Sequence, residues 1–540
     1  MLTRFFAHRP RPPLKDTLRR TDAFYHIIRL PIHQHTAYMS TILLATLNAR
    51  YIHASLGLRY LYANMGALRP QTCLREFTID QRPIDICEAL LSHNPRVIGL
   101  GVYIWNVEES ARVVALLKQI APQVCIVLGG PEVSFEHAGR DIIRLADYVI
   151  CGAADHAFAT LCNALLNDTR PAAKLITPEL PELASLMSPY DDYTDDDIRH
   201  RLTYVEASRG CPFKCEFCLS ALDKTAWPFD IERFLLDMDK LYQRGARHFK
   251  FVDRTFNLNA KISIRIMEFF LARMDDRLFV HFELVPDHLP DSIKDIITRF
   301  PPGRLQFEIG IQSFNTDVQN LISRRQNNQK SADNLRWLRE HTHAHIHADL
   351  IFGLPGEDLA SFGRGFDQLV ALNPHEIQVG ILKRLRGTPI IRHATAYAMR
   401  YNPHPPYNIL STDRIDFATM QRMARFARYW DMIANSGRFT LTRPYISGDA
   451  PFARFLSLAD ALWAQTGQTH RIALERLFEL LLRILPTQSA ATASEIQHAL
   501  LEDFRATGAQ HIPKSLIHPL EPTAKRQTTS QRQSRHIRAS

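Results

Sequence analysis

Short apolar runs alternate with helical periodicity from Thr41 to about Asn167. They predict strands at 42–47, 74–79, 97–103, 125–128 and 148–151, with helices between them such as 56–68 and 107–120. This alternation is typical of an α/β domain with a Rossmann-like parallel sheet covered by helices on both faces. Such sheets bind ligands at the carboxyl ends of their strands, where the loops 48–55 and 129–132 lie. We expect this first domain to span 39–170.

A second alternating series begins after a proline-broken, acidic linker at 171–200. Its strands are predicted at 202–206, 248–252, 280–284, 305–311, 344–352 and 376–382, and its helices include 231–242, 260–274 and 358–371. Six strand–helix units predict a central, partial (β/α)6 barrel over 201–400. In barrels of this kind the catalytic groups lie at the carboxyl ends of the strands.

Helical patterns alone follow the barrel, at 415–430, 451–466, 471–485 and 493–507, and predict a small C-terminal all-α domain over 401–510. Residues 511–540 have the composition of a basic disordered tail. Residues 1–38 are rich in Arg, Pro and His, which is typical of disorder or of a targeting segment. Met39 precedes the first strand, so this extension is also interpreted as a misassigned translation start.

The net charge of +9 is concentrated at the two ends of the chain. Residues 1–20 and 511–540 each hold six Lys/Arg and a single acid, so the 490 residues between them carry a net charge of −1. This distribution does not indicate a nucleic-acid partner. The chain has no apolar run of about 18 residues, so no membrane span is predicted. Five of the eight cysteines are scattered singly, as expected of free thiols in the reducing cytoplasm.

Three cysteines stand together directly after the first barrel strand. Cys211, Cys215 and Cys218 have the spacing C-x3-C-x2-C. Iron–sulfur clusters are held by Cys thiolates, and a four-iron cluster normally takes four. No Cys follows Cys218, so three ligands predict a [4Fe-4S] cluster with one iron open to a small molecule. The alternatives are a zinc knuckle, which would need a second Cys/His pair nearby, and three buried core thiols.

At these residues the chain resembles the radical S-adenosylmethionine (SAM) superfamily, whose signature has this spacing with an aromatic residue, here Phe217, before the last Cys. The resemblance implies that the open iron binds SAM, which the reduced cluster cleaves to a 5′-deoxyadenosyl radical. Oxygen-independent coproporphyrinogen oxidase, a member of this family, contacts SAM through residues on successive strands. The positions that match here are Glu283, Gln312, Arg324 and Asp349, and the resemblance also makes Phe217, Asp253 and Gly353 candidate SAM contacts. The family's Gly-rich turn is replaced by Asp253-Arg254-Thr255.

The first domain resembles the cobalamin (B12)-binding domain fused to many radical SAM enzymes. The shared pieces are Gly57-Leu58, Gly129-Gly130-Pro131 and the stretch 147–152. The D-x-H-x-x-G loop that supplies a cobalt ligand is absent, and the usual G-E-G-E is replaced by Gly152-Ala153-Ala154-Asp155. The resemblance implies cobalamin contacts by residues at the strand ends, for which the candidates are Asn48, His53, Gly129 and Gly130. The helical C-terminal domain resembles one found on a subgroup of these proteins.

The sequence thus predicts a radical SAM enzyme. Its expected chemistry is cobalamin-dependent methyl transfer, or other carbon-centred radical chemistry, on a small-molecule or cofactor-like substrate. The expected partner is an electron donor such as flavodoxin or ferredoxin, without a membrane or a nucleic acid. The alternatives are an RNA methylthiotransferase, which uses three further N-terminal cysteines, and a non-enzymatic cluster or cobalamin sensor. No catalytic residue is predicted beyond the cluster ligands.

Overall fold

A computed structural model describes residues 41–223, 226–509 and 511–517. The predicted extension 1–38 and most of the predicted tail lie outside these residues. The tail's first residues do not follow the prediction of disorder, because 514–517 form helix α18, whose Leu516 is buried.

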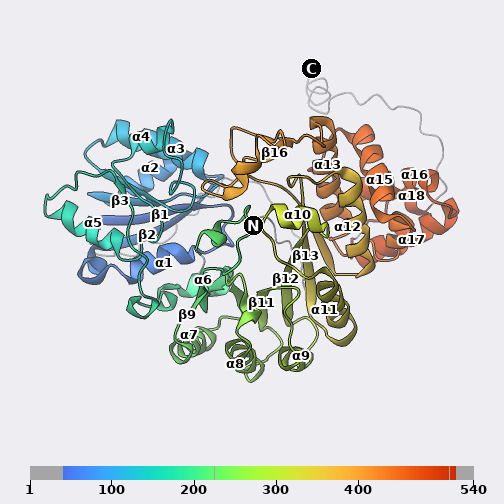
Figure 1. Ribbon diagram of the computed structural model, residues 1–540, viewed down its shortest axis with the longest axis horizontal. Coiled ribbons are helices and arrows are strands. Elements are labelled where there is room, and N and C mark those ends of the chain that lie inside the picture. The colour runs from blue at the N-terminus through green and yellow to red at the C-terminus, as the bar shows by residue number, and fades with distance from the viewer. Residues whose placement is uncertain (1–40, 224–225, 510, 518–540) are drawn as a thin grey trace, which may run out of the picture. The chain divides into compact units, whose positions relative to one another are not determined.

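The first sheet is parallel and six-stranded, in the order β2-β1-β3-β4-β5-β6. All seven residues of β1 are buried, as expected of a strand covered on both faces. One apolar core packs under α2 and α3 and another under α1 and α5 (Figure 1). The strands are β1 Ile42–Asn48, β2 Thr72–Thr78, β3 Val97–Gly101, β4 Cys125–Gly129, β5 Tyr148–Ile150 and β6 Leu175–Ile176. The helices are α1 Leu56–Ala63, α2 Pro83–Leu91, α3 Val107–Ile120, α4 Asp141–Leu145 and α5 Ala157–Leu166.

The order of this sheet reverses at β1, which pairs with β2 on one side and with β3 on the other. The connections that leave β1 and β3 therefore run in opposite directions, and parallel sheets bind ligands at such a reversal. Two elements differ from the sequence-based expectation. Helix α1 ends at Ala63 and a 3-10 turn follows it, and the predicted linker contains β6 and helix α6 (Asp195–His200).

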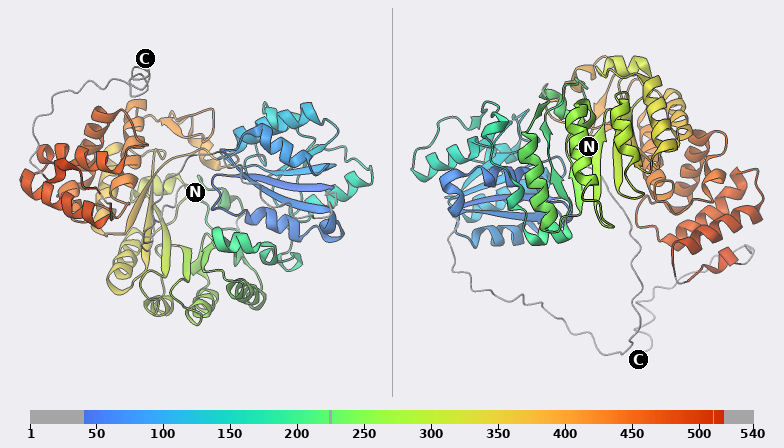
Figure 2. Two further views of the ribbon diagram at one scale, coloured as in Figure 1. Left: turned by 180° about the vertical axis from the view of Figure 1, so that it is seen from behind. Right: turned by 90° about the horizontal axis from the view of Figure 1, so that it is seen from below.

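The second sheet confirms the predicted partial barrel. It is parallel and six-stranded, in the order β14-β13-β12-β11-β10-β7. Helices follow the strands and cover the outer face (Figure 2). The strands are β7 Thr203–Val205, β10 His248–Phe251, β11 Phe279–Leu284, β12 Leu305–Gln312, β13 His345–Phe352 and β14 Glu376–Ile381. The helices are α7 Ile231–Gln243, α8 Ala260–Leu271, α9 Asp291–Thr298, α10 Thr316–Leu321, α11 Asn328–His341 and α12 Leu359–Ala371.

The C-terminal region is helical, as predicted, and packs onto the barrel through aromatic side chains. Phe366 of α12 lies edge-on to Trp430, with 4.7 Å between the ring centroids, and both belong to one continuous apolar core. In the described residues no helix is long and apolar enough to span a bilayer. The C-terminal helices are α13 Phe417–Ile433, α14 Arg443–Ser447, α15 Pro451–Thr466, α16 Leu474–Gln488, α17 Ala493–Ala506 and α18 Lys514–Ile517.

Candidate functional site

The three-cysteine loop leaves the carboxyl end of β7. Its base is a short antiparallel ladder between β8 (Ser208–Arg209) and β9 (Trp227–Pro228). Cys211 and Cys215 are buried, Cys218 is half-buried, and all three are free thiols. The Cys218 N–H donates to the Cys215 carbonyl at 3.1 Å, so the second half of the motif is a tight turn. The loop therefore gathers three sulfurs at the rim of the barrel.

Asp253 holds the start of this loop. The backbone N–H of Ala207 and the hydroxyl of Ser208 donate to its two carboxylate oxygens at 3.0 and 2.6 Å. Burial raises the pKa of Asp253 to about 7, against the opposing effect of these hydrogen bonds. Both oxygens are used within the protein, so the geometry gives Asp253 a role in positioning the loop. A direct contact of Asp253 with SAM remains a prediction.

Glu216, inside the motif, holds the other side of the loop. Its buried carboxylate accepts from Ser323 at 2.6 Å, from His393 at 2.9 Å and from Arg392. Its backbone N–H donates to Ile322, and its carbonyl accepts from Ile390. The partners are more than 100 residues away in the sequence, so no local pattern could have identified this anchor.

Two arginines bring positive charge to the sulfurs. Arg324 Nη1 lies 3.6 Å from Cys215 Sγ. The pKa of Arg254 is raised chiefly by Glu283 and further by the nearby Cys218 sulfur. Burial raises the pKa of the Cys211 thiol to about 11. A coordinating thiol is deprotonated outright by its metal, and nearby cations favour the thiolate. The rim is thus suited to an anionic, thiolate-ligated group.

The predicted SAM contacts converge on the same rim. Arg254 forms an ion pair with Glu283 at 2.8 Å, and Arg324 donates to the Gly310 carbonyl. A Cβ at Gly310 would lie 2.4 Å from the amide nitrogen of Gln312, so this glycine makes room for the Gln312 side chain. Gly353 has φ +90° and packs against Ile409, which gives it a structural role. The ring of Phe217 packs against the barrel core.

Two of these side chains carry buried oxygens without a donor. Within the described residues, Gln312 Oε1 and Asp349 Oδ2 accept no hydrogen bond. An unsatisfied buried polar atom costs about 1–3 kcal/mol, which a bound polar ligand would remove. Together with Arg324 beside Cys215, these atoms fit SAM, whose carboxylate would meet Arg324 and whose amino and hydroxyl groups would donate to the free oxygens. Asp349 and Gln312 would then hold SAM against the cluster.

Below this rim lies a layer of buried charge that the sequence analysis missed. Lys250 faces Glu308 at 3.7 Å, and His281 faces the same carboxylate at 3.4 Å. His347 bridges Asp349 and Glu376. The sequence contains a signal for this layer. Polar residues occupy every second position of the barrel strands, whose other face is covered by helices. Alternation of this kind predicts a polar barrel interior.

At the carboxyl edge of the first sheet, glycines leave the strand ends open. Gly130 has φ +105°, and a Cβ there would lie 2.5 Å from the Val102 carbonyl oxygen. Gly152 has φ +93°, and a Cβ there would meet no atom within 4 Å, while a Cβ at Gly129 would meet only the Ile150 carbonyl oxygen at 4.0 Å. Tyr51, Ile52 and Phe135 are exposed on the neighbouring loops. An open edge flanked by exposed apolar side chains fits a large planar cofactor such as cobalamin.

The two polar cobalamin candidates have partners in the protein. Asn48 is buried and donates to Glu76 at 2.9 Å, within a cluster that includes the ion pair of Arg59 with Glu76. His53 Nδ1 lies 2.7 Å from the Tyr204 hydroxyl, and burial lowers the pKa of His53. The cluster around Glu76 was not recognised in the sequence. Contacts of Asn48 and His53 with cobalamin remain predictions.

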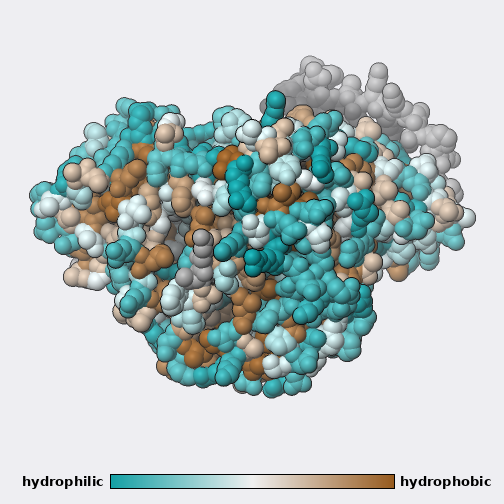
Figure 3. Space-filling model, in the orientation of Figure 1, coloured by the Kyte–Doolittle hydropathy of each residue, from teal (hydrophilic) through white to brown (hydrophobic). Residues whose placement is uncertain are grey.

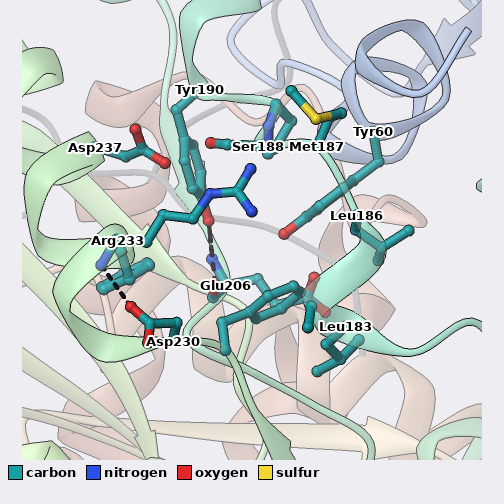
Figure 4. Close-up of a pocket in the computed structure, with 14 residues that line it drawn as sticks. Tyr60, Leu183, Leu186, Met187, Ser188, Tyr190, Glu206, Asp230, Arg233 and Asp237 are labelled. Atoms are coloured by element: carbon teal, nitrogen blue, oxygen red, sulfur yellow. Dashed lines mark hydrogen bonds between the residues drawn. The ribbon is translucent and has the colours of Figure 1, made fainter. Parts of the chain in front are cut away.

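A pocket lies beside the base of the cysteine loop, between α1, the segment 183–190 and the start of α7 (Figure 4). Tyr60, Tyr190 and Glu206 line it, and Arg233 projects across it. Glu206 pairs with Arg209 at 3.1 Å on the loop side. None of the cysteines or SAM candidates lines this pocket, so it is separate from the rim.

Among the residues that the structure describes, no three His, Cys, Asp or Glu side chains are grouped around a position for one metal ion. A four-iron cluster spreads its ligands over different iron atoms, so the two kinds of site have different geometries. Of the other cysteines, Cys87 and Cys151 lie in one apolar core, and Cys125 and Cys162 in another.

Three family models match successive parts of the chain. Residues 42–162 match the B12 binding domain, residues 205–368 the radical SAM superfamily, and residues 395–539 a protein family of unknown function (DUF4080). The radical SAM and B12-binding matches support a [4Fe-4S] cluster, SAM and cobalamin as the cofactors. They confirm the predicted combination of domains.

Curated relatives match part of the chain. An uncharacterised methyltransferase of Pyrococcus horikoshii is 29% identical over 213 residues, 34% of this chain and 46% of that protein. The cobalamin-dependent radical SAM methyltransferase TokK of Streptomyces tokunonensis is 27% identical over 332 residues, 53% of this chain and 47% of that protein. The chain thus spans about half the length of the curated relatives it matches.

Among solved structures, the radical SAM methyltransferase TsrM from Kitasatospora setae, with cobalamin and a [4Fe-4S] cluster bound, aligns with a TM-score of 0.55 at 15% identity. The alignment covers 87% of this chain and 99% of that one. At this level of identity the similarity shows a shared fold.

Proposed function

This chain joins a B12-binding domain to a radical SAM domain, and we propose that it uses them together as a cobalamin-dependent methyltransferase acting on a small molecule. The observation that carries the proposal is the grouping of Arg324, Gln312 and Asp349 beside the cysteine loop. Arg324 lies 3.6 Å from Cys215, while Gln312 and Asp349 each keep a buried oxygen without a donor. These three side chains offer a cation and two acceptors to one zwitterionic ligand at the position of the thiolates.

The bound cluster would supply the electron for reductive cleavage of SAM, and bound cobalamin would carry a methyl group. The residues of this chain would position them. Arg324 would bind the SAM carboxylate through its charge and through Nη1, because Nε and Nη2 donate to Gln326. Asp349 and Gln312 would accept from the amino or ribose hydroxyl groups. Asp253 and Glu216 would keep the cysteine loop in place, and the open edge at Gly129 and Gly152 would hold the corrin.

Reduction of the cluster needs a one-electron donor, and we propose a flavodoxin or ferredoxin for this role. The free thiols of the chain suit the reducing cytoplasm as the compartment. The substrate of the methyl transfer is proposed only as a small molecule. The polar barrel interior around Lys250, Glu308 and His347 suits a substrate with polar groups.

Methylthiolation of RNA is a weaker alternative. It would need a second cluster held by the first domain, whereas Cys87, Cys125 and Cys162 are each buried in apolar cores beneath its sheet. Burial raises the pKa of Cys87 to about 11 and that of Cys125 to about 12, which opposes thiolate formation. A sensor without enzymatic activity would have no use for the SAM-binding side chains.

The proposal is tested by anaerobic reconstitution with iron, sulfide and hydroxocobalamin, followed by incubation with SAM and dithionite. Wild-type protein should release 5′-deoxyadenosine, and the triple variant C211A/C215A/C218A should release none. If the wild type binds a cluster but cleaves no SAM, the radical SAM assignment is wrong. If the triple variant retains a full cluster, the ligand assignment is wrong.

A further inference from the structure

The outer side of the cysteine loop carries a small cationic surface with an apolar centre. Lys214, Arg325, Ile391 and Arg392 are all exposed, and we refer to these four residues as the loop patch. Arg392 is 60% exposed although it also contacts Glu216, and Ile391 is 41% exposed. None of these residues was identified in the sequence, where they lie in three separate segments.

The three segments are joined by direct contacts. The Glu216 N–H donates to the Ile322 carbonyl and the Ile390 N–H donates to the Glu216 carbonyl, both at 3.0 Å. The Glu216 side chain accepts from Ser323 and Arg392. Lys214 is two residues before Glu216, and Arg325 is two residues after Ser323. The cysteine loop therefore adjoins both other segments at Glu216, and the four residues of the loop patch all lie within two positions of these contacts.

This surface is more basic than the rest of the folded body. In the segments 211–218, 320–327 and 389–396, every exposed charged side chain is cationic, and the one acid, Glu216, is buried. Residues 21–510 together have a net charge of −1, so the cations of the loop patch are a local feature. The nearest exposed carboxylate along the sequence is Asp317, at the start of α10, and the half-buried carboxylate of Asp287 accepts from the Asn327 N–H at the end of one segment. On the face drawn in Figure 3, hydrophilic residues cover much of the surface, with hydrophobic residues scattered among them.

The loop patch adjoins the cysteines along the chain. Lys214 is bonded to Cys215, whose side chain is buried. Arg325 follows Arg324, whose guanidinium lies 3.6 Å from Cys215 Sγ. Lys214 and Arg325 are thus each one residue away from Cys215 or from the arginine that contacts it.

We propose that the loop patch is the docking surface for an acidic one-electron carrier protein of the flavodoxin or ferredoxin kind. The inference rests on the proposed function, because only a redox-active cluster needs a carrier. One electron moves from the reduced carrier to the cluster, so the carrier is oxidised and the cluster reduced, and no bond or proton is transferred. Complementary charge raises the rate of encounter, and Ile391 supplies the apolar contact typical of the centre of an interface.

The test compares two reductants on the same reconstituted protein. Formation of 5′-deoxyadenosine is measured with enzymatically reduced flavodoxin and, separately, with dithionite, which needs no docking site. The variant K214E/R325E should lose about tenfold or more of the flavodoxin-driven rate, and that rate in the wild type should fall as salt is raised. The dithionite-driven rate should stay at the wild-type value. K261E, which reverses an exposed charge on α8, is the matched control.

Equal flavodoxin-driven rates in K214E/R325E and K261E would overturn the docking proposal. A wild type that cleaves no SAM with dithionite would instead overturn the proposed function, so the two failures are distinguishable. If charge reversal also lowers the dithionite-driven rate, the neutral variant K214Q/R325Q replaces it. For K214Q/R325Q, the flavodoxin-driven rate is divided by the dithionite-driven rate. If this ratio equals that of the wild type, the docking proposal is wrong.

Discussion

His347 lies 3.1 Å from Asp349 and 3.2 Å from Glu376, so one imidazole bridges two carboxylates inside the barrel. Glu376 also pairs with His345 at 3.0 Å, and His345 stacks on His375 with 4.6 Å between the ring centroids. A row of titratable groups thus runs from the proposed SAM contact Asp349 along β13 and β14. The arrangement fixes the orientation of Asp349 before any ligand is bound.

This bridge predicts a pH dependence of stability. Burial alone would lower the pKa of His347, but its contacts with Asp349 and Glu376 raise the pKa to about 10. A raised pKa means that the stabilisation is fully present below about pH 6.5 and is lost as the pH rises through about 10. We expect His347→Gln to lower the free energy of unfolding by about 3 kcal/mol at neutral pH, because it removes the cation beside the buried carboxylate of Asp349, while Glu376 keeps His345.

The measurement is the melting temperature of wild type and H347Q from pH 6 to 10.5. The difference between them should be largest near neutral pH and shrink at the alkaline end. H470Q, at an exposed histidine, is the control and should follow the wild type throughout. A difference between H347Q and wild type that does not change with pH would show that His347 is neutral in the folded protein.

Arg324 is expected to decide the affinity for SAM. Arg324→Lys keeps the charge but loses the planar guanidinium, whose Nε and Nη2 donate to Gln326 and Gly310 and so orient Nη1, and SAM binding should weaken by about tenfold or more. The iron and sulfide content should remain that of the wild type, because the cysteines are unchanged. Equilibrium binding of SAM to reconstituted protein gives the affinity, and R325K is the control at the next residue. Equal weakening in both variants would contradict a specific carboxylate contact.

Glu216 is expected to be needed for retention of the cluster. Glu216→Ala removes the acceptor of Ser323, Arg392 and His393 and frees the loop from two other segments. We expect a loss of about 3 kcal/mol in stability and less iron per protein after gel filtration. Arg392→Gln is the comparison. The Arg392 side chain is 60% exposed, so this substitution should lower the stability by less than about 1 kcal/mol. Full iron retention in E216A would limit Glu216 to a structural role.

The sequence predicted what is local and periodic. The barrel strands were predicted close to where they are observed, and the cysteine loop was recognised as a motif of eight residues directly after one of them. Glu216 lay inside that motif, yet its role was invisible because His393 is 177 residues away. Asp253 was a candidate SAM contact by resemblance, and that contact stays a prediction. Its carboxylate also accepts from Ala207 and Ser208, a loop contact that sequence spacing cannot reveal.

The open edge of the first sheet predicts unequal effects of two glycine substitutions. Gly130→Ala would place a Cβ 2.5 Å from the Val102 carbonyl oxygen at φ +105°, so the loop has to shift. Gly152→Ala also has a positive φ, of +93°, but its Cβ would meet no atom within 4 Å. We expect G130A to lower stability by about 2 kcal/mol or more and G152A by about 1 kcal/mol. Thermal unfolding of the apoprotein compares them, and equal losses would contradict the steric explanation.

His53 is expected not to bind cobalt. Its Nδ1 lies 2.7 Å from the Tyr204 hydroxyl, and the loop that supplies a histidine ligand in some cobalamin proteins is absent from this chain. Hydroxocobalamin titrated into the full-length protein should therefore give the same absorption and electron paramagnetic resonance spectra with wild type and His53→Gln. The control is Tyr204→Phe, which frees Nδ1 without removing the imidazole. A nitrogen hyperfine signal on reduced cobalt that H53Q abolishes would instead identify His53 as the ligand, and its strengthening in Y204F would show that the tyrosine competes with the metal.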